Sequence, residues 1–301
     1  MTAASVANAG AAHASSPPVL SSPGSSSHGS PSSARGPLRA AILDWAGTAI
    51  DFGSRAPVAA LLGLFADHGI PLDEAQARGP MGLHKRDHIR LLCQLPSVSA
   101  AFQARDGRPA SEADIDTLYQ ALLPRTLQAA KETTVLIPGL LALVAELRRR
   151  GMRIGSTTGY NAQMMAEIAP LAAAQGYAPD SIMTVSDVPA GRPAPWMCFR
   201  TAERFGVYPL STCVKIGDTV TDIEEGKNAG MWTIALARCG NEVGLSEADL
   251  HALPAAEQAA RIATARQRLL AAQPHYVVDG PADVIPLLDA IDGRLARGEM
   301  P

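Results

Sequence analysis

From residue 37 onward, the chain alternates short apolar segments with stretches of helical periodicity. The apolar segments have the length of buried strands and lie at 39–45, 153–158, 181–185, 212–218, 232–237 and 275–279. Helical patterns that end in a glycine occupy 139–151, 161–176 and 221–230. Because strands that alternate with helical crossovers form parallel sheets, the sequence predicts an α/β fold with a doubly wound, mainly parallel Rossmann-like sheet.

One segment interrupts this alternation. Residues 54–132 carry only helical patterns, at 57–69, 79–95 and 111–131, and the last begins with a capping arrangement of Ser111 and Asp114. Connections inside a compact domain are usually short, so a helical block of this length is not an ordinary crossover. We therefore expect an inserted all-helical cap domain at 54–132, and an α/β catalytic core built from 37–53 and 133–301.

The first 36 residues differ in composition from the rest of the chain. They consist mainly of Ala, Ser, Gly and Pro, and Arg35 is the only Asp, Glu, Lys or Arg among them. Such a segment buries too little apolar surface to offset the entropy of ordering, so we expect residues 1–36 to be a disordered tail. The tail lacks the basic start and continuous apolar stretch of a secretory signal.

Composition argues against several classes of partner and site. A formal net charge of -3 and an aromatic content of 4% offer neither a basic field nor stacking platforms for nucleic acid. No apolar run reaches the roughly 18 residues that a membrane span needs. Four cysteines without a CxxC pair, at 93, 198, 213 and 239, argue against a disulfide framework or a zinc site and favour a cytoplasmic protein.

Acidic residues follow two of the predicted strands. Asp44 and Asp218 leave apolar segments into glycine-containing loops, and Asp222 lies about one helical turn further on. Ligands of such sheets bind at the carboxyl ends of the strands, so these three carboxylates are expected to converge. A bound cation would relieve their repulsion, and oxygen ligands favour Mg²⁺. Each acid alone would more often be a strand-end cap.

Two further strand ends offer groups that can bind an anion. Thr158 and Gly159 supply a hydroxyl and backbone N–H groups where a helix is expected to start, although alone they would be an ordinary helix cap. Arg192 lies in a Gly/Pro-rich loop, where its guanidinium could neutralise phosphoryl charge or simply be solvated. Together these residues favour a site that can bind an anionic, phosphoryl-type group.

The motifs at these strand ends resemble those of a known superfamily. "DWAGT", "STTG", "GRP" and "GDTVTD" are similar, in this order, to the four motifs of the haloacid dehalogenase superfamily. The longer stretches "PMGLHKRDH", "IGSTTGY" and "VPAGRPAPWMC" resemble the phosphonoacetaldehyde hydrolase family in particular. The resemblance covers about 37–301, and it implies a helical cap over the core and a homodimer.

The resemblance also implies a role for each matching residue. Asp44 is the expected nucleophile, and Lys85 is expected to form an imine with the substrate aldehyde. Thr158, Gly159 and Arg192 are expected to bind the phosphoryl oxygens. Mg²⁺ is expected to be bound by Asp44, the backbone carbonyl of Ala46 and Asp218, with Asp222 ordering its water shell. Met81, His88 and Tyr160 match positions around the lysine.

The implied reaction is hydrolysis of the P–C bond of phosphonoacetaldehyde to acetaldehyde and phosphate, in 2-aminoethylphosphonate degradation. Such a bond breaks only if an electron sink accepts the carbon's electron pair, and a lysine imine is such a sink. Lys85 must be neutral to attack, so its pKa must fall through burial or through cationic neighbours such as Arg86. On one helix, Met81, Lys85 and His88 would share a face, which makes His88 a candidate proton relay. Without the resemblance, Lys85 would be taken for a solvated helix lysine.

Ala46 separates this interpretation from its alternatives. A Mg-dependent phosphatase of the same superfamily, acting on a small phosphorylated metabolite, is the leading alternative, and a phosphomutase is similar. Both would need an acid at position 46 to protonate a leaving alkoxide. A dehalogenase would not need the acidic "GDTVTD" loop, and a non-catalytic relative would be expected to lose some of the acids. Members of the superfamily usually carry a lysine where this chain has Arg192, and we hypothesise that arginine avoids a second imine.

Overall fold

The computed structural model describes residues 36–301, so the disorder expected for 1–36 falls almost entirely outside the described residues. Six strands form one sheet, and each lies within its predicted range. They are β1 (Ala40–Leu43), β2 (Arg153–Thr158), β3 (Ser181–Thr184), β4 (Cys213–Gly217), β5 (Trp232–Leu236) and β6 (Tyr276–Val278). The predicted α/β fold is therefore confirmed.

The strand order places β1 beside the point where the winding direction changes. The order is β3-β2-β1-β4-β5-β6, and every neighbouring pair is parallel. The chain leaves β1 first toward β2 and β3, and later returns to β4, β5 and β6. Leu43 at the end of β1 lies opposite Ser156 and Ile216. The residues that follow β1, β2 and β4 therefore meet at one edge of the sheet, where such folds bind ligands.

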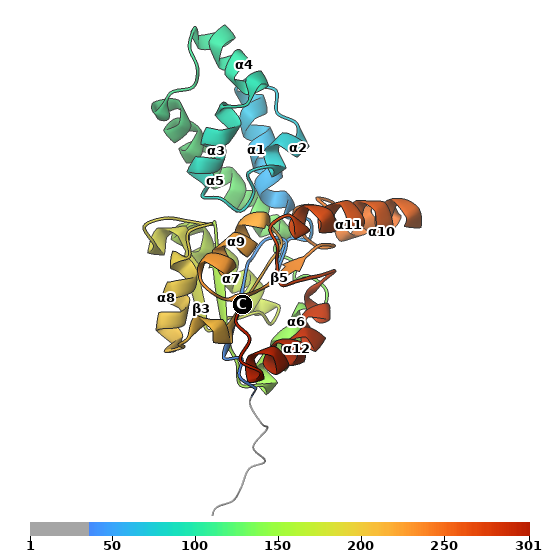
Figure 1. Cartoon of the computed structure of the whole chain (residues 1–301). Coiled ribbons are helices and arrows are strands. Elements are labelled where there is room, and N and C mark those ends of the chain that lie inside the picture. Colours follow the sequence, from blue (N-terminus) through green and yellow to red (C-terminus); the bar gives the residue numbers. More distant parts are fainter. Residues whose placement is uncertain (1–35) are drawn as a thin grey trace, which may run out of the picture. The chain divides into compact units, whose positions relative to one another are not determined.

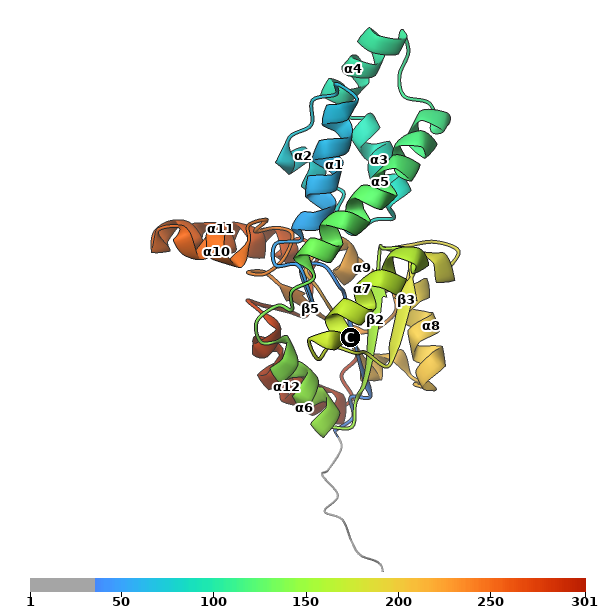
Figure 2. The same ribbon diagram turned by 180° about the vertical axis from the view of Figure 1, so that it is seen from behind.

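Helices cover both faces of the sheet, so all four residues of β1 are buried. Ala41 and Leu43 face the apolar cluster shared with α6 (Leu140–Arg149), α7 (Ala162–Ala174) and α12 (Ile285–Ala296) (Figure 2). Ala40 and Ile42 face α8 (Trp196–Phe205) on the opposite side, where α9 (Val220–Asn228) and α11 (Ala255–Leu270) also pack (Figure 1). The short α10 (Glu247–Ala252) and three 3₁₀ turns, Val185–Asp187, Leu210–Thr212 and Pro281–Val284, complete this part.

The segment between β1 and β2 contains a group of helices that lie beside one another (Figure 1). They are α1 (Arg55–Asp67), α2 (Glu74–Arg78), α3 (Lys85–Cys93), α4 (Pro96–Asp106) and α5 (Glu112–Thr133), followed by α6. These five helices share an apolar cluster of their own, which includes Phe65, Leu92 and Leu118. This separate cluster supports the predicted division into cap and core, which remains a prediction.

The local signals within this insert were partly correct. The capping arrangement is confirmed, since Ser111 Oγ accepts the N–H of Asp114 at 3.3 Å and Asp114 Oδ2 accepts the N–H of Ser111 at 2.7 Å. The single helix expected at 79–95 is wrong, because residues 79–84 form a turn and α3 starts at Lys85. Gly82 adopts a φ of +90°, which no helix accommodates, and a Cβ there would lie 1.9 Å from Thr221 Oγ1.

Two properties of the whole described chain complete the fold. All four cysteine thiols are free and buried. None of the helices within 36–301 combines the length and the apolar character needed to cross a membrane.

Candidate active site

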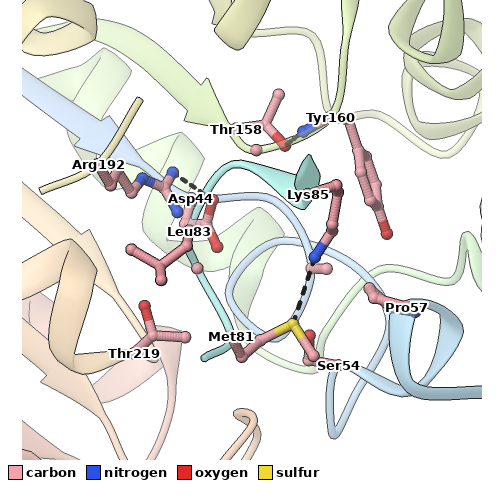
Figure 3. A pocket seen from close by; sticks show the side chains of 13 residues that line it. Asp44, Ser54, Pro57, Met81, Leu83, Lys85, Thr158, Tyr160, Arg192 and Thr219 are labelled. Atoms are coloured by element: carbon pink, nitrogen blue, oxygen red, sulfur yellow. Dashed lines mark hydrogen bonds and ion pairs between the residues drawn. The ribbon is translucent and has the colours of Figure 1, made fainter. Parts of the chain in front are cut away.

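A small pocket lies at the carboxyl edge of the sheet, and Figure 3 shows the side chains around it. Its cavity volume is about 30 Å³, which is well below that of a typical small-molecule site. The strand ends supply Asp44, Ala46, Thr158, Gly159, Tyr160, Arg192 and Thr219, and the helical insert with its entry supplies Ser54, Pro57, Met81, Gly82, Leu83 and Lys85. Eleven residues were expected to form the site, and eight of them line this pocket. Asp218 and Asp222 lie beside it, in a carboxylate cluster with Asp44, and His88 does not reach it.

Asp44 occupies the centre of this edge because it directly follows β1. Its backbone N–H donates to the carbonyl of Ile216 at 3.0 Å, which extends the β1–β4 ladder by one residue. Its Oδ1 accepts a hydrogen bond of 2.5 Å from Nη2 of Arg192 (Figure 3). Burial raises the pKa of Asp44, while the positive charge of Arg192 opposes that rise.

Three carboxylates converge next to the pocket. Asp44, Asp218 and Asp222 each offer an oxygen, and these oxygens lie within 4.8 Å of one another. Asp218 is fixed by hydrogen bonds from Thr48 Oγ1 at 2.9 Å and from Asn241 N at 2.8 Å. Burial and the two neighbouring acids raise the pKa of Asp218 well above its usual range. Such a cluster is unfavourable without a cation.

Two cations lie behind the cluster, inside the protein. Arg192 forms ion pairs with Asp44, with Asp222 at 2.9 Å and with Glu225 at 3.0 Å. Lys215 forms ion pairs with Asp222 at 2.9 Å and with Glu225 at 3.2 Å. Burial alone would raise the pKa of Asp222, but Arg192 and Lys215 lower it below its usual value.

The formal charges of this group fit a divalent cation. Asp44, Asp218, Asp222 and Glu225 contribute four negative charges, and Arg192 and Lys215 contribute two positive ones. With all six groups ionised, and Lys85 not counted, the formal charge is −2, which one divalent ion would neutralise. The three clustered aspartates offer carboxylate oxygens, which suit a hard cation.

Lys85 enters the pocket from the first position of α3. Its Nζ lies 3.5 Å from the sulfur of Met81, as drawn in Figure 3, and it forms no ion pair with any carboxylate within residues 36–301. Burial lowers the pKa of Lys85 to about 8; Asp44 opposes this shift, and Arg192 adds to it. The expected cationic neighbour was Arg86, but that side chain pairs with Glu112 and Asp116 instead.

Met81, Lys85 and His88 do not share a helical face as expected, because α3 begins only at Lys85. Met81 reaches the lysine from the preceding turn. His88 is buried and does not line the pocket, and its Nε2 lies 2.9 Å from the carbonyl of Ala77. Burial lowers the pKa of His88 to about 3, so the ring is neutral and Nε2 carries the proton in that hydrogen bond. Its role as a proton relay stays a prediction.

Thr158, Gly159 and Tyr160 line the pocket, but they do not start a helix. Thr158 is the last residue of β2, and its Oγ1 accepts the N–H of Tyr160 at 3.1 Å. The helix α7 begins only at Ala162, where Asn161 Oδ1 accepts the N–H of Met164 at 2.9 Å. We expected Thr158 and Gly159 to lie at the N-terminus of a helix, where they could bind an anion. That placement is wrong, because α7 begins only at Ala162. The Tyr160 hydroxyl is buried without a hydrogen-bond partner among the described residues and points into the pocket region (Figure 3).

Sequence reasoning missed two kinds of site residue. Ser54 lines the pocket and belongs to none of the quoted motifs, while Leu83 and Thr219 lie within "PMGLHKRDH" and "GDTVTD" but were given no role. Lys215 and Glu225 are completely buried behind it. A signal for both was available, because a lysine stands inside the apolar strand "CVKIG" and Glu225 follows Asp222 by three residues on one helix.

The fold and the carboxylate site define a haloacid dehalogenase-like hydrolase. The family model with that description matches residues 38–230, and a related hydrolase-like model matches 189–283. The chain is 48% identical to a phosphonoacetaldehyde hydrolase of Nitratidesulfovibrio vulgaris over 88% of this chain and 95% of that one. For a phosphonoacetaldehyde hydrolase of Pseudomonas aeruginosa the identity is 41%, over 88% and 96% of the two chains.

A solved structure is similar over the same range. It is a phosphonoacetaldehyde hydrolase-like protein from Oleispira antarctica, with a TM-score of 0.86 and 42% identity, and the match covers 89% of this chain and 97% of that chain. The chain belongs to the phosphonoacetaldehyde hydrolase family of haloacid dehalogenase-like hydrolases.

Proposed function

We propose that this enzyme hydrolyses the P–C bond of phosphonoacetaldehyde, giving acetaldehyde and phosphate, as a step of 2-aminoethylphosphonate degradation. One observation supports this proposal most strongly: a buried lysine without a carboxylate partner among the described residues shares a small pocket with Asp44. The relatives that carry the name of this activity match nearly the whole described chain.

Lys85 begins the proposed reaction as a neutral amine. A pKa of about 8 leaves a useful fraction of Lys85 unprotonated near neutral pH. Its Nζ adds to the aldehyde carbon, and loss of water gives a protonated imine. The methylene carbon bonded to phosphorus is then next to an electron sink.

Asp44 then attacks the phosphorus in line with the P–C bond. The P–C electron pair moves into a carbon–carbon double bond, the imine becomes a neutral enamine, and Asp44 carries the phosphoryl group. Protonation of the enamine carbon and hydrolysis of the resulting imine release acetaldehyde and restore Lys85. Water cleaves the aspartyl phosphate to phosphate, which restores Asp44.

Other residues of the pocket bind the reacting groups. Arg192 already donates a hydrogen bond to Asp44, so its guanidinium is placed to contact phosphoryl oxygens there. Thr158 and Gly159 offer further donors from the end of β2. Met81 and Tyr160 border the lysine and limit the space around the aldehyde.

The divalent ion is proposed to be Mg²⁺, bound by Asp44, Asp218 and the backbone carbonyl of Ala46, with Asp222 ordering its water shell. The net charge of −2 and the oxygen donors support this assignment. When bound, Mg²⁺ would supply positive charge that offsets repulsion between the carboxylates and the phosphoryl oxygens.

Ala46 supports P–C hydrolysis over the alternative, a Mg-dependent phosphatase. Ala46 lines the pocket beside Asp44 and has no proton to give to a leaving alkoxide. An enamine leaving group is neutral and does not need that proton. The same position would limit turnover of a phosphate monoester.

The test is a product assay with purified full-length protein and Mg²⁺. Phosphonoacetaldehyde should yield phosphate and acetaldehyde in equal amounts, while small phosphate monoesters should react far more slowly. Rapid monoester hydrolysis with no acetaldehyde from phosphonoacetaldehyde would support the phosphatase instead.

We further propose that the chain forms a homodimer and works in the cytoplasm. Four free, buried thiols are consistent with a reducing compartment. Light scattering at micromolar concentration measures the assembly directly, and a monomeric mass would contradict the proposed dimer.

A further inference from the structure

The ion pairs behind the pocket have an arrangement that the proposed reaction does not use. Glu225 lies on α9 and is completely buried. All of its hydrogen bonds and ion pairs within 36–301 involve one oxygen, Oε2, and its other oxygen is buried without a partner. A buried carboxylate with three donors on one oxygen is held in a single orientation.

The three donors come from two strands and a loop. Nε of Arg192 donates at 3.0 Å, Oγ1 of Thr157 on β2 donates at 3.2 Å, and Nζ of Lys215 on β4 lies 3.2 Å away. Lys215 Nζ also donates to Thr157 Oγ1 at 2.9 Å. Glu225, Lys215 and Thr157 therefore form a closed triangle of contacts inside the core.

Glu225, which belongs to this triangle, holds the guanidinium of Arg192 by accepting a hydrogen bond from its Nε. With Nε bonded to Glu225, Nη2 donates to Asp44 and to the carbonyl and Oγ1 of Thr157, at 2.8 and 3.0 Å, and Nη1 contacts Asp222. A guanidinium is planar, so fixing Nε fixes the direction of both other nitrogens.

We propose that Glu225, braced by Lys215 and Thr157, is a positioning residue that aims Arg192 at the phosphoryl group. Glu225 does not line the pocket, and its polar partners within 36–301 are Thr157, Arg192 and Lys215. It acts through Arg192, and this inference rests on the phosphoryl-binding role proposed for that arginine. Without Glu225, the guanidinium can rotate about its side-chain bonds and lose the geometry that an oxyanion requires.

Glu225→Gln separates positioning from simple electrostatics. Removal of a negative charge near the pocket should by itself tighten the binding of an anion. A neutral amide oxygen cannot hold three donors as a carboxylate does, so the positioning role predicts the opposite. We expect the Kd for inorganic phosphate, measured by calorimetry with Mg²⁺ present, to rise at least about 10-fold, with a comparable loss of kcat/KM.

Glu224→Gln is the matched control, because Glu224 precedes Glu225 on the same helix, is half-buried and forms no ion pair among the described residues. It should bind phosphate as the wild type does. Unfolding temperatures of both variants are measured in parallel, and Glu225→Asp, which keeps the charge but loses reach, replaces Glu225→Gln if the latter does not fold.

A double-mutant cycle with Arg192→Lys gives the decisive readout. If Glu225 acts through Arg192, Glu225→Gln should change phosphate binding less than about 2-fold when Arg192 is already lysine. Additive effects of the two substitutions, or phosphate binding that is unchanged or tighter in Glu225→Gln, would overturn the inference.

The outcome is separable from that of the proposed function. A wild type that binds phosphate but releases no acetaldehyde contradicts the proposed reaction and leaves this inference open to the same binding test. A wild type that releases both products, with Glu225→Gln equal to it, contradicts this inference alone.

Discussion

Lys85 and Lys215 are both buried near Asp44, but only Lys215 forms ion pairs with carboxylates within residues 36–301. Burial would lower the pKa of both lysines. For Lys215, Asp222 and Glu225 reverse this effect and raise the pKa above its usual value. For Lys85, burial prevails and the pKa falls to about 8. Of these two buried amines, Lys85 is therefore the one suited to act as a nucleophile near neutral pH.

The first prediction concerns the pH dependence of stability. The pKa of Lys85 is lower in the folded protein than its ordinary value of 10.5, so the unfolded chain binds more protons between about pH 8 and 10.5. The unfavourable contribution of Lys85 to stability should therefore shrink as the pH rises across that window, and this part of the pH dependence should be missing from Lys85→Met. At pH 7, Lys85→Met should stabilise the protein by about 3 kcal/mol, because each pKa unit corresponds to ~1.4 kcal/mol.

Urea unfolding of wild type and Lys85→Met at several pH values measures this. The control is Lys131→Met, because Lys131 is exposed and pairs with Glu167 on the surface. Equal dependence on pH in wild type and Lys85→Met would show that Lys85 does not titrate abnormally.

The second prediction concerns Ala46. Ala46→Asp would add a fifth carboxylate beside a site that already carries a net charge of −2. We expect P–C cleavage to fall at least about 10-fold, since the added charge disfavours an anionic substrate by more than ~1.4 kcal/mol. Hydrolysis of small phosphate monoesters should rise, because an acid is then available for the leaving group.

Ala46→Asn is the matched control for size without charge. Steady-state assays on both kinds of substrate compare the two variants. If Ala46→Asp left P–C cleavage unchanged or improved it, the explanation for the missing acid would have to be replaced.

The third prediction concerns the choice of arginine at 192. Our sequence-based hypothesis was that a lysine there would form a second imine. The structure offers another reason, because Arg192 contacts Asp44, Asp222 and Glu225 at once, and a lysine with three such neighbours would stay protonated. Arg192→Lys should therefore lower kcat/KM at least about 100-fold. That factor corresponds to ~3 kcal/mol of transition-state stabilisation, which is lost with the charge-assisted hydrogen bonds of the guanidinium.

Mass spectrometry after borohydride reduction distinguishes the two reasons. The structure predicts little adduct at position 192 in this variant, whereas the second-imine hypothesis predicts a substantial one. Normal turnover without an adduct at 192 would contradict both.

The fourth prediction concerns the metal. The proposed site exists only in the folded protein, so Mg²⁺ should raise the unfolding temperature of the wild type. At a Mg²⁺ concentration 100 times its Kd, the free energy of unfolding should increase by ~2.7 kcal/mol. Asp218→Asn should remove this effect, because it removes one of the expected ligands, while Asp106→Asn at an exposed position should keep it. Thermal unfolding with Mg²⁺ or EDTA measures both variants. An equal Mg²⁺ effect in Asp218→Asn would place the ion elsewhere.

Local patterns predicted the sheet and the convergence of its acids well. Each strand is a short apolar run, and parallel strands bring Asp44 and Asp218 to one edge whatever the details of packing. The helix α11 was missed because its ends lack the usual signals: no side chain caps its start, and Ala271 rather than a glycine follows it.

Features that depend on tertiary contacts could not be predicted in the same way. The turn at 79–84 depends on Gly82 lying against Thr221, far away in sequence. His88 turns toward the carbonyl of Ala77, although its position suggested a contact with Lys85. Lys215 on β4 pairs with acids on α9, and Glu225 on α9 pairs with Arg192 in a distant loop, so these ion pairs appear only once the chain is folded.

The central claim is that Lys85 forms an imine with the substrate, and borohydride trapping tests it most directly. The full-length enzyme is incubated with phosphonoacetaldehyde, reduced with borohydride and digested, and the modified lysine is located by mass spectrometry. The account predicts a reduced adduct on Lys85 with loss of activity, and no adduct at Lys215. Lys131→Arg should be labelled and inactivated as the wild type is, whereas Lys85→Arg should show neither labelling nor P–C cleavage. An unlabelled Lys85 in an enzyme that still releases acetaldehyde and phosphate would contradict the account.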